Sequence, residues 1–140
     1  MTTRLPPKGS LITYPYLWLS QADQGETEGR KDRPCCLLLQ VWDAATETHH
    51  LMILAVSSQP PRKDQTALQV PDTERRRGGL ARYPAAWVVV SEYNYDIAER
   101  SFYLDLAAEV LGAFSPTFMG RIAATLKAEM AQGRTRVNRT

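Results

Sequence analysis

Apolar residues in this chain occur in short runs separated by polar or Pro/Gly-containing segments. Runs such as Cys35–Leu39 and Trp87–Val90 are far shorter than the ~20 apolar residues that a membrane-spanning helix needs. Short runs rich in β-branched residues and bounded by turn residues are typical of β-strands. The pattern therefore predicts a mainly β protein and gives no support to a membrane-spanning helix.

The expected strands follow these runs in chain order. Cys35–Trp42 and Leu51–Val56, separated by the polar segment Asp43–His50, predict an antiparallel β-hairpin. Pro15 cannot donate a backbone hydrogen bond and favours a sheet edge or a bulge in the first strand. Strands are also expected at Leu11–Leu19, Ala67–Val70, Ala86–Tyr93 and Ser101–Leu104, a mobile loop at Ser20–Asp32, and one helical turn at Pro71–Arg77.

One helix is expected late in the chain, at about 115–132. Ser115 is a favourable N-cap and Pro116 suits the first helical position. Apolar residues then recur four residues apart, as Phe118, Ile122, Leu126 and Met130. The 140 residues suit a single domain, which we place at residues 1–133: a small β-barrel with the helix packed on it. Residues 134–140 are expected to form a basic, flexible tail that can be deleted without loss of activity.

The basic residues of the chain are mostly arginine. The chain has 13 Arg and 4 Lys, but its formal net charge is only +2. Arginine is favoured where a planar group grips phosphate or carboxylate. The positive charge is concentrated in residues 62–82 and 132–140, at +3 each, and the remainder sums to −4. This segregation indicates an anionic partner, and the run Arg75–Arg77 is a candidate contact for RNA phosphates.

Several classes of chemistry lack the residues they need. His49 and His50 are adjacent, so on a strand they face opposite ways and do not make a metal site. Cys35 and Cys36 are adjacent too, and are expected to be buried, reduced thiols. Phosphate-binding glycine motifs and nucleophile elbows are absent. We expect no metal and no cofactor, and a cytoplasmic protein, because the first residues lack the apolar core of a secretory signal.

Arg33 and Ser57 are the strongest candidates for a functional site. Pro34 biases Arg33 toward an extended conformation at the start of the first hairpin strand. Ser57 follows the second strand. In an antiparallel hairpin the start of one strand lies beside the end of the other, so the two side chains are predicted to share one rim.

The order of four segments resembles the MazF/PemK family of toxin–antitoxin ribonucleases, in a divergent PemK-like branch. These segments are Gly9–Ile12, the loop that ends in Arg33-Pro34, Ala55–Gln59, and a Val-rich strand that leads into Ser91–Tyr93. The resemblance covers about residues 9–130. It implies an SH3-like barrel of the CcdB/PemK type, usually a homodimer, which cleaves single-stranded RNA without a metal and is inhibited by a cognate antitoxin peptide.

The resemblance also assigns roles to residues. Arg33 takes the place of the catalytic arginine, Ser57 that of the catalytic threonine, and Glu28 that of the acidic loop residue. The loop glycine, Gly29, stands one place earlier than usual, and Tyr95 stands near the position where some members have a second arginine. Candidate RNA contacts are Arg30, Lys31, Ser58, Gln59, Arg62, Arg75, Arg76 and Arg77.

Other assignments stay open on the sequence. The general base could be Glu28, Asp32, Glu92 or one of the two histidines. Tyr14, Tyr16, Trp18 and Tyr93 could stack RNA bases, although the barrel core would bury most of them. The alternative functions are a catalytically weak RNA- or protein-binding module with an SH3-like fold and a gyrase-directed, CcdB-like toxin. The polar C-terminal residues disfavour the second of these.

Overall fold

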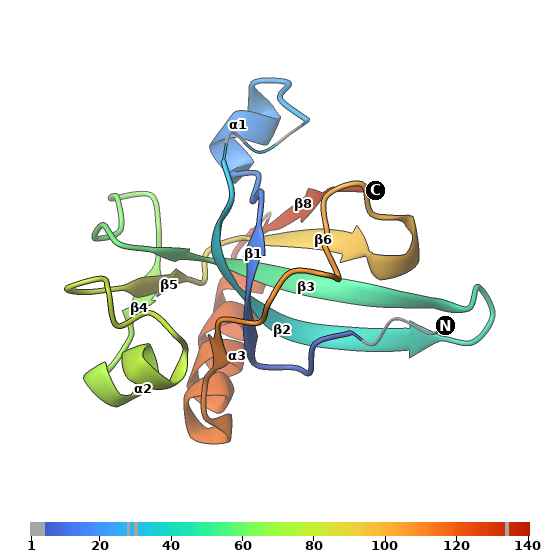
Figure 1. The fold of residues 1–140 in the computed structure, drawn as a ribbon. Helices are drawn as coiled ribbons and strands as arrows, with labels where there is room; N and C mark the ends of the chain where they lie inside the picture. Colours follow the sequence, from blue (N-terminus) through green and yellow to red (C-terminus); the bar gives the residue numbers. More distant parts are fainter. Residues whose placement is uncertain (1–4, 28, 30, 134) are drawn as a thin grey trace.

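The computed structural model describes residues 5–27, 29, 31–133 and 135–140. Its strands form a curled, mainly antiparallel half-barrel sheet with one long helix, α3, packed against it (Figure 1). The predicted mainly β fold with a C-terminal helix is therefore confirmed. The elements are β1 (Ser10–Tyr14), α1 (Leu19–Asp23), β2 (Arg33–Asp43), β3 (Thr48–Ser57), β4 (Ala67–Gln69), α2 (Asp72–Arg77), β5 (Trp87–Val89), β6 (Tyr93–Ile97), the 3₁₀ turn η1 (Ala98–Arg100), β7 (Gly112–Ala113), α3 (Pro116–Met130) and β8 (Arg136–Asn138).

The β2–β3 hairpin is the centre of the sheet. Its register pairs Cys35 with Ala55 and Asp43 with Thr48, with one irregularity between Leu37 and Leu39. β3 changes its second partner along its length: its first half pairs with β6 and its last residues pair with β5. The predicted hairpin is confirmed, and it runs from one end of the molecule to the other (Figure 1).

Hydrophobic residues are buried on both faces of the hairpin. Cys36 lies in the cluster that includes α3, and Cys35 lies in a second cluster with Tyr14 and Tyr16. Adjacent strand residues point to opposite faces, so this separation follows from the strand geometry. Both cysteines are free and buried, as predicted, and burial raises the pKa of both thiols, that of Cys36 to about 12. Neither thiol is a reactive group near neutral pH.

The predicted helical features are largely confirmed. Ser115 caps α3 by accepting a hydrogen bond from the backbone N–H of Phe118, and it also donates to a carboxylate oxygen of Glu74 in the α2 turn. Phe118, Ile122 and Leu126 are buried, but Met130 is 44 % exposed because it is the last residue of the helix.

The first strand is shorter than predicted, and the loop that follows is partly helical. β1 ends at Tyr14 because Pro15 has no N–H to continue the ladder. Ser20–Asp32 was expected to be a mobile loop, but Leu19–Asp23 forms α1. The side chain of Gln21 accepts a hydrogen bond from the backbone N–H of Trp18 and so caps the first turn.

Two other strand predictions are corrected. Ser101–Leu104 is not a strand; the hydroxyl of Ser101 donates to Asp96 and accepts from the backbone N–H groups of Tyr103 and Leu104, which holds the segment in a turn. The expected strand Ala86–Tyr93 is split between β5 and β6.

The expectation of a flexible tail is wrong for the described residues 135–140. β8 pairs in parallel with β6, and Val137 is buried. Arg139 is only 6 % exposed; its guanidinium donates to the carbonyl oxygen of Pro15 and to Asn94 Oδ1, and it lies 3.9 Å from the centroid of the Tyr103 ring. The edge of β6 accounts for this ordering, because its free backbone groups form hydrogen bonds with the tail. The polar, basic sequence of the tail gives no sign of this pairing. Arg134 lies outside the described residues.

Candidate functional site

Arg33 and Ser57 lie at the same end of the hairpin. β2 begins at Arg33, β3 ends at Ser57, and the pairing of Cys35 with Ala55 places the two residues across the ladder from each other. Both line a hollow of about 230 Å³, here called the Arg33 hollow, together with Lys31, Asp32, Ser58, Gln59 and Tyr83. The predicted shared rim of Arg33 and Ser57 is confirmed.

The Arg33 side chain is half-buried beside an aromatic ring. Its guanidinium carbon lies 5.0 Å from the centroid of the Trp18 ring, and its Nε is buried without a hydrogen-bond partner among the described residues. A cation over an indole ring is stabilised by the ring's quadrupole. A buried donor that lacks a partner costs free energy unless a ligand or water completes it. Arg33 also lines the Arg33 hollow, so its positive charge lies beside any anionic group that binds there.

The Ser57 hydroxyl is held in place by a turn of its own backbone. Its Oγ donates to the carbonyl oxygen of Gln59 and accepts from the N–H of Gln59, each at 3.0 Å. Such turns are a common use of serine directly after a strand. The hydroxyl can change its donor partner when a ligand arrives, because its hydrogen rotates freely about the C–O bond.

A second and larger hollow adjoins the first. It has a volume of about 520 Å³ and lies between α1 and the segment after β3. We call it the Trp18 hollow, and it shares Ser57 and Gln59 with the Arg33 hollow. Its further lining includes Trp18, Gln21, Gln24, Arg62 and Gln65. The candidate site is therefore a pair of adjacent hollows at the open end of the hairpin.

Glycine is required where the loop before β2 crosses the end of β1. A Cβ atom at Gly29 would lie 2.2 Å from the carbonyl oxygen of Pro15, which no side chain tolerates. The loop backbone can follow this path only with glycine at this position. Glu28 and Arg30, both predicted site residues, lie outside the described residues.

Asp32 and Glu92, two further candidates for the general base, lie in different surroundings. Asp32 lines the Arg33 hollow. Glu92 is buried and its Oε1 accepts hydrogen bonds from the backbone N–H of Leu19 and the hydroxyl of Tyr16, while burial raises its pKa. Glu92 thereby anchors the start of α1, which carries the Trp18 wall. We assign it a positioning role.

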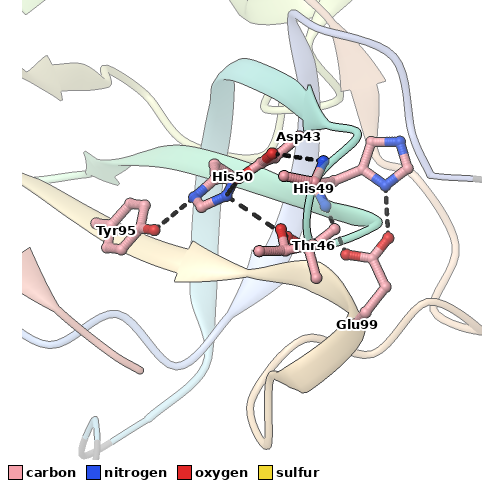
Figure 2. A network of polar contacts seen from close by, with 8 residues as sticks. Asp43, Thr46, His49, His50, Tyr95 and Glu99 are labelled. Carbon is pink, nitrogen blue, oxygen red and sulfur yellow. Dashed lines mark hydrogen bonds and ion pairs between the residues drawn. The ribbon is translucent and has the colours of Figure 1, made fainter.

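The two histidines lie at the other end of the hairpin, as Figure 2 shows. His50 is seven residues before Ser57 on β3, which corresponds to about 23 Å along a strand. His49 contacts Glu99, and His50 contacts the Tyr95 hydroxyl and Asp43. Neither histidine can serve as a base for a group bound at Arg33. No cluster of three or more metal-ligating residues occurs in the described part of the chain.

The predicted RNA-contacting residues do not all share the site. Arg75 is taken up by the fold, because its guanidinium donates to the carbonyl oxygens of Ala81 and Tyr83 and pairs with Asp72. These contacts hold the Arg75 guanidinium within the fold, and Arg75 lines neither hollow. Arg76 and Arg77 are exposed on α2 and line neither hollow, whereas Lys31, Ser58, Gln59 and Arg62 line one or both.

Burial distinguishes the aromatic residues that were candidates for stacking on RNA bases. Tyr14, Tyr16 and Tyr93 are buried, and of the four only Trp18 lines a hollow. Tyr95, which stands near the position where some MazF/PemK toxins have a second arginine, has the guanidinium carbon of Arg136 4.8 Å from its ring centroid.

Gln21, Gln24 and Gln65 line the Trp18 hollow but were not predicted as site residues from the sequence. These glutamines precede and follow the β2–β3 hairpin in the chain. They line one hollow because the structure places α1 beside the segment after β3, and the sequence did not predict that placement.

No known family model, curated protein or solved structure matches this chain. Within the described residues, none of the helices is both long and apolar enough to span a bilayer.

Proposed function

We propose that this protein is a metal-independent endoribonuclease that cleaves single-stranded RNA in the Arg33 hollow. The observation that carries the proposal is the convergence of Arg33, Ser57 and Asp32 on one hollow at the open end of the hairpin. In transfer within a phosphodiester, a fixed cation can stabilise the charge on the phosphorane, a hydroxyl can donate to the phosphate and a carboxylate can act as the base.

The reaction divides naturally among these groups. A base removes the proton from the 2′-hydroxyl, the 2′-oxygen forms a bond to phosphorus, and the bond from phosphorus to the 5′-oxygen breaks. The 5′-oxygen takes up a proton, and the products are a 2′,3′-cyclic phosphate and a 5′-hydroxyl. Arg33 stabilises the charge on the phosphorane, since a guanidinium stays protonated and donates in a fixed fork. Ser57 donates a second hydrogen bond to the same phosphate.

Asp32 is the base that we favour among the described residues, because it is the one carboxylate of that part of the chain in the Arg33 hollow. Glu28, the residue indicated by the resemblance to MazF/PemK toxins, is the second candidate. Replacing each by its amide distinguishes them: the variant that loses the basic group should lose the acidic limb of its pH–rate profile.

The proposal also includes four finer assignments. They are an SH3-like barrel, a homodimer, a cytoplasmic location and inhibition by an antitoxin peptide that covers the RNA site. A mainly β half-barrel with a helix on one face supports the first of these, and the others rest on the resemblance alone.

The test is cleavage of a mixed single-stranded RNA in the presence of EDTA. Wild type should produce fragments with 2′,3′-cyclic phosphate ends, and Arg33→Ala should cleave about 10²–10³-fold more slowly. The exposed Arg100, which lines neither hollow, supplies the control variant Arg100→Ala, which should cleave like wild type. Intact RNA with wild type would overturn the proposal.

A second function is binding of RNA without cleavage. It is favoured by Glu92, whose carboxylate holds the start of α1, so that Asp32 is the one carboxylate among the described residues that line the Arg33 hollow. RNA affinity that falls steeply with salt, without any cleavage, would support this alternative.

A further inference from the structure

The Trp18 hollow has the size and lining of a ligand site. Its volume of about 520 Å³ falls within the range of small-molecule pockets. The lining combines one indole with amide, hydroxyl and guanidinium groups, and none of the described lining residues is a carboxylate. Such a surface suits a flat, polar ring that belongs to an anionic molecule.

Hydrogen bonds within the protein fix the polarity of this lining. Gln21 Oε1 accepts from the backbone N–H of Trp18 at 3.2 Å, and Gln65 Oε1 accepts from the backbone N–H of Arg62 at 3.1 Å. With their carbonyl oxygens occupied, both amides keep their NH₂ groups for a ligand. Arg62 has donors only. The hollow therefore offers mainly donors.

The aromatic wall is held rigidly. The Trp18 ring packs edge-on against Tyr16 with centroids 5.0 Å apart, and Tyr16 is itself buried and bonded to Glu92. Arg33 lies against the same indole. A base that stacks on Trp18 would thus lie directly beside a phosphate held by Arg33 and Ser57.

We propose that the Trp18 hollow is a base subsite that selects guanine next to the scissile phosphate. The inference rests on the proposed function, which places the phosphate in the Arg33 hollow. Guanine presents two neighbouring acceptors, N7 and O6, whereas adenine and cytosine present an exocyclic NH₂ donor on the corresponding edge. A donor facing the NH₂ groups of Gln21 and Gln65 would leave both sides unpaired. Stacking on Trp18 adds affinity for any base, and the donors add the selection.

The experiment measures binding of non-cleavable 2′-O-methyl trinucleotides that differ only in the central base, with uridine on both sides. Fluorescence anisotropy at constant salt gives the four affinities. The trinucleotide with guanine should bind about tenfold more tightly than the one with adenine.

Gln65→Glu is the decisive variant. It keeps the Oε1 that accepts from Arg62 N–H and replaces the donor by an acceptor, so the turn is preserved while the polarity changes. The preference for guanine over adenine should disappear. Gln69→Glu adds the same charge at an exposed position on β4 outside the hollow, and should keep the preference.

The outcomes separate this inference from the proposed function. Equal affinities for the four trinucleotides, a preference for another base, or a guanine preference that survives Gln65→Glu would overturn the base subsite. A guanine preference that Gln65→Glu removes, in a protein that cleaves no RNA, would uphold the subsite and overturn the ribonuclease proposal.

Discussion

The two ends of the β2–β3 hairpin have opposite characters. At the turn end the titratable groups are paired with one another: His49 with Glu99, and His50 with Asp43 and Tyr95 (Figure 2). At the open end, Arg33 keeps a buried Nε without a partner among the described residues and stands over a hollow. A paired polar cluster stabilises the fold, whereas an incompletely paired one in a concave place is prepared for a ligand.

The pKa values of one carboxylate at each end are shifted in opposite directions. Burial raises the pKa of Glu92 at the open end. At the turn end, burial alone would raise the pKa of Glu99, but hydrogen bonds from the His49 ring and backbone outweigh it and lower the pKa. Contacts at the turn end thus favour the charged form of Glu99, whereas burial at the open end makes the charged form of Glu92 cost free energy.

The largest expected effect separates two arginines that each lie against an aromatic ring. Arg33 lies on Trp18 at the open end, and Arg136 lies on Tyr95 beside the histidines. Arg33→Ala should slow RNA cleavage about 10²–10³-fold, because it removes the charge that stabilises the transition state. Arg136→Ala should change the rate by less than about threefold. Single-turnover rates for both variants test the contrast, and equal losses would place the chemistry elsewhere.

The next effect concerns β8, which pairs in parallel with β6. Removing residues 134–140 exposes the β6 edge, deletes buried Val137 and takes the Arg139 donor from Pro15 and Asn94. Loss of the apolar burial costs about 1.5–3 kcal/mol. The Pro15 carbonyl oxygen loses its donor at a cost of about 1–3 kcal/mol more, whereas Asn94 Oδ1 still accepts from the Leu17 N–H. We expect the Tm to fall by roughly 10 °C or more. Removing only the exposed Thr140 is the control; a full truncation with an unchanged Tm would contradict the pairing of β8.

A smaller effect should distinguish two hydroxyls on β3. Ser57→Ala removes a donor to a charged phosphate, a loss of about 1.5–3 kcal/mol or roughly 10–100-fold in cleavage rate, with little change in stability. Thr48 lies at the turn end, buried, with its Oγ beside the Thr46 hydroxyl. Thr48→Ala should lower the free energy of unfolding by about 1 kcal/mol and leave the rate unchanged. Thermal melts and cleavage assays on both proteins would show whether the two roles separate.

The smallest effect is a pH dependence of opposite sign for the two glutamates. Because the folded-state pKa of Glu92 is raised, its charge costs stability above the ordinary pKa of about 4.3. Glu92→Gln, whose amide oxygen can still accept from Leu19 and Tyr16, should raise the Tm at pH 7 and lose this advantage as the pH falls below that value.

Glu99 should behave in the opposite way. Its lowered pKa contributes stability above the ordinary value, and this contribution is lost as the pH falls through the folded pKa. Glu99→Gln should therefore lower the Tm at pH 7 and match wild type in acid. Melts from about pH 3 to 8 test both glutamates, and curves with the same sign would refute the contrast between the two ends.

Local patterns in the sequence were sufficient for much of the fold. The short β-branched runs predicted the hairpin, Ser115-Pro116 predicted the start of α3, and the antiparallel rule placed Arg33 beside Ser57. Each of these features depends on a residue's neighbours in the chain or on the geometry of one hairpin, so no distant contact is needed to infer it.

The tertiary structure decided what depends on distant partners. Arg139 is ordered because β6 offers an unpaired edge and Pro15 a free carbonyl oxygen, more than 100 residues earlier in the chain. Glu92 became an anchor for α1 because the sheet brings it to the Leu19 N–H, and Arg75 became a structural donor because its turn folds back on it. Residue types determined which groups this chain could use, and burial and long-range hydrogen bonds determined which remained open to a ligand.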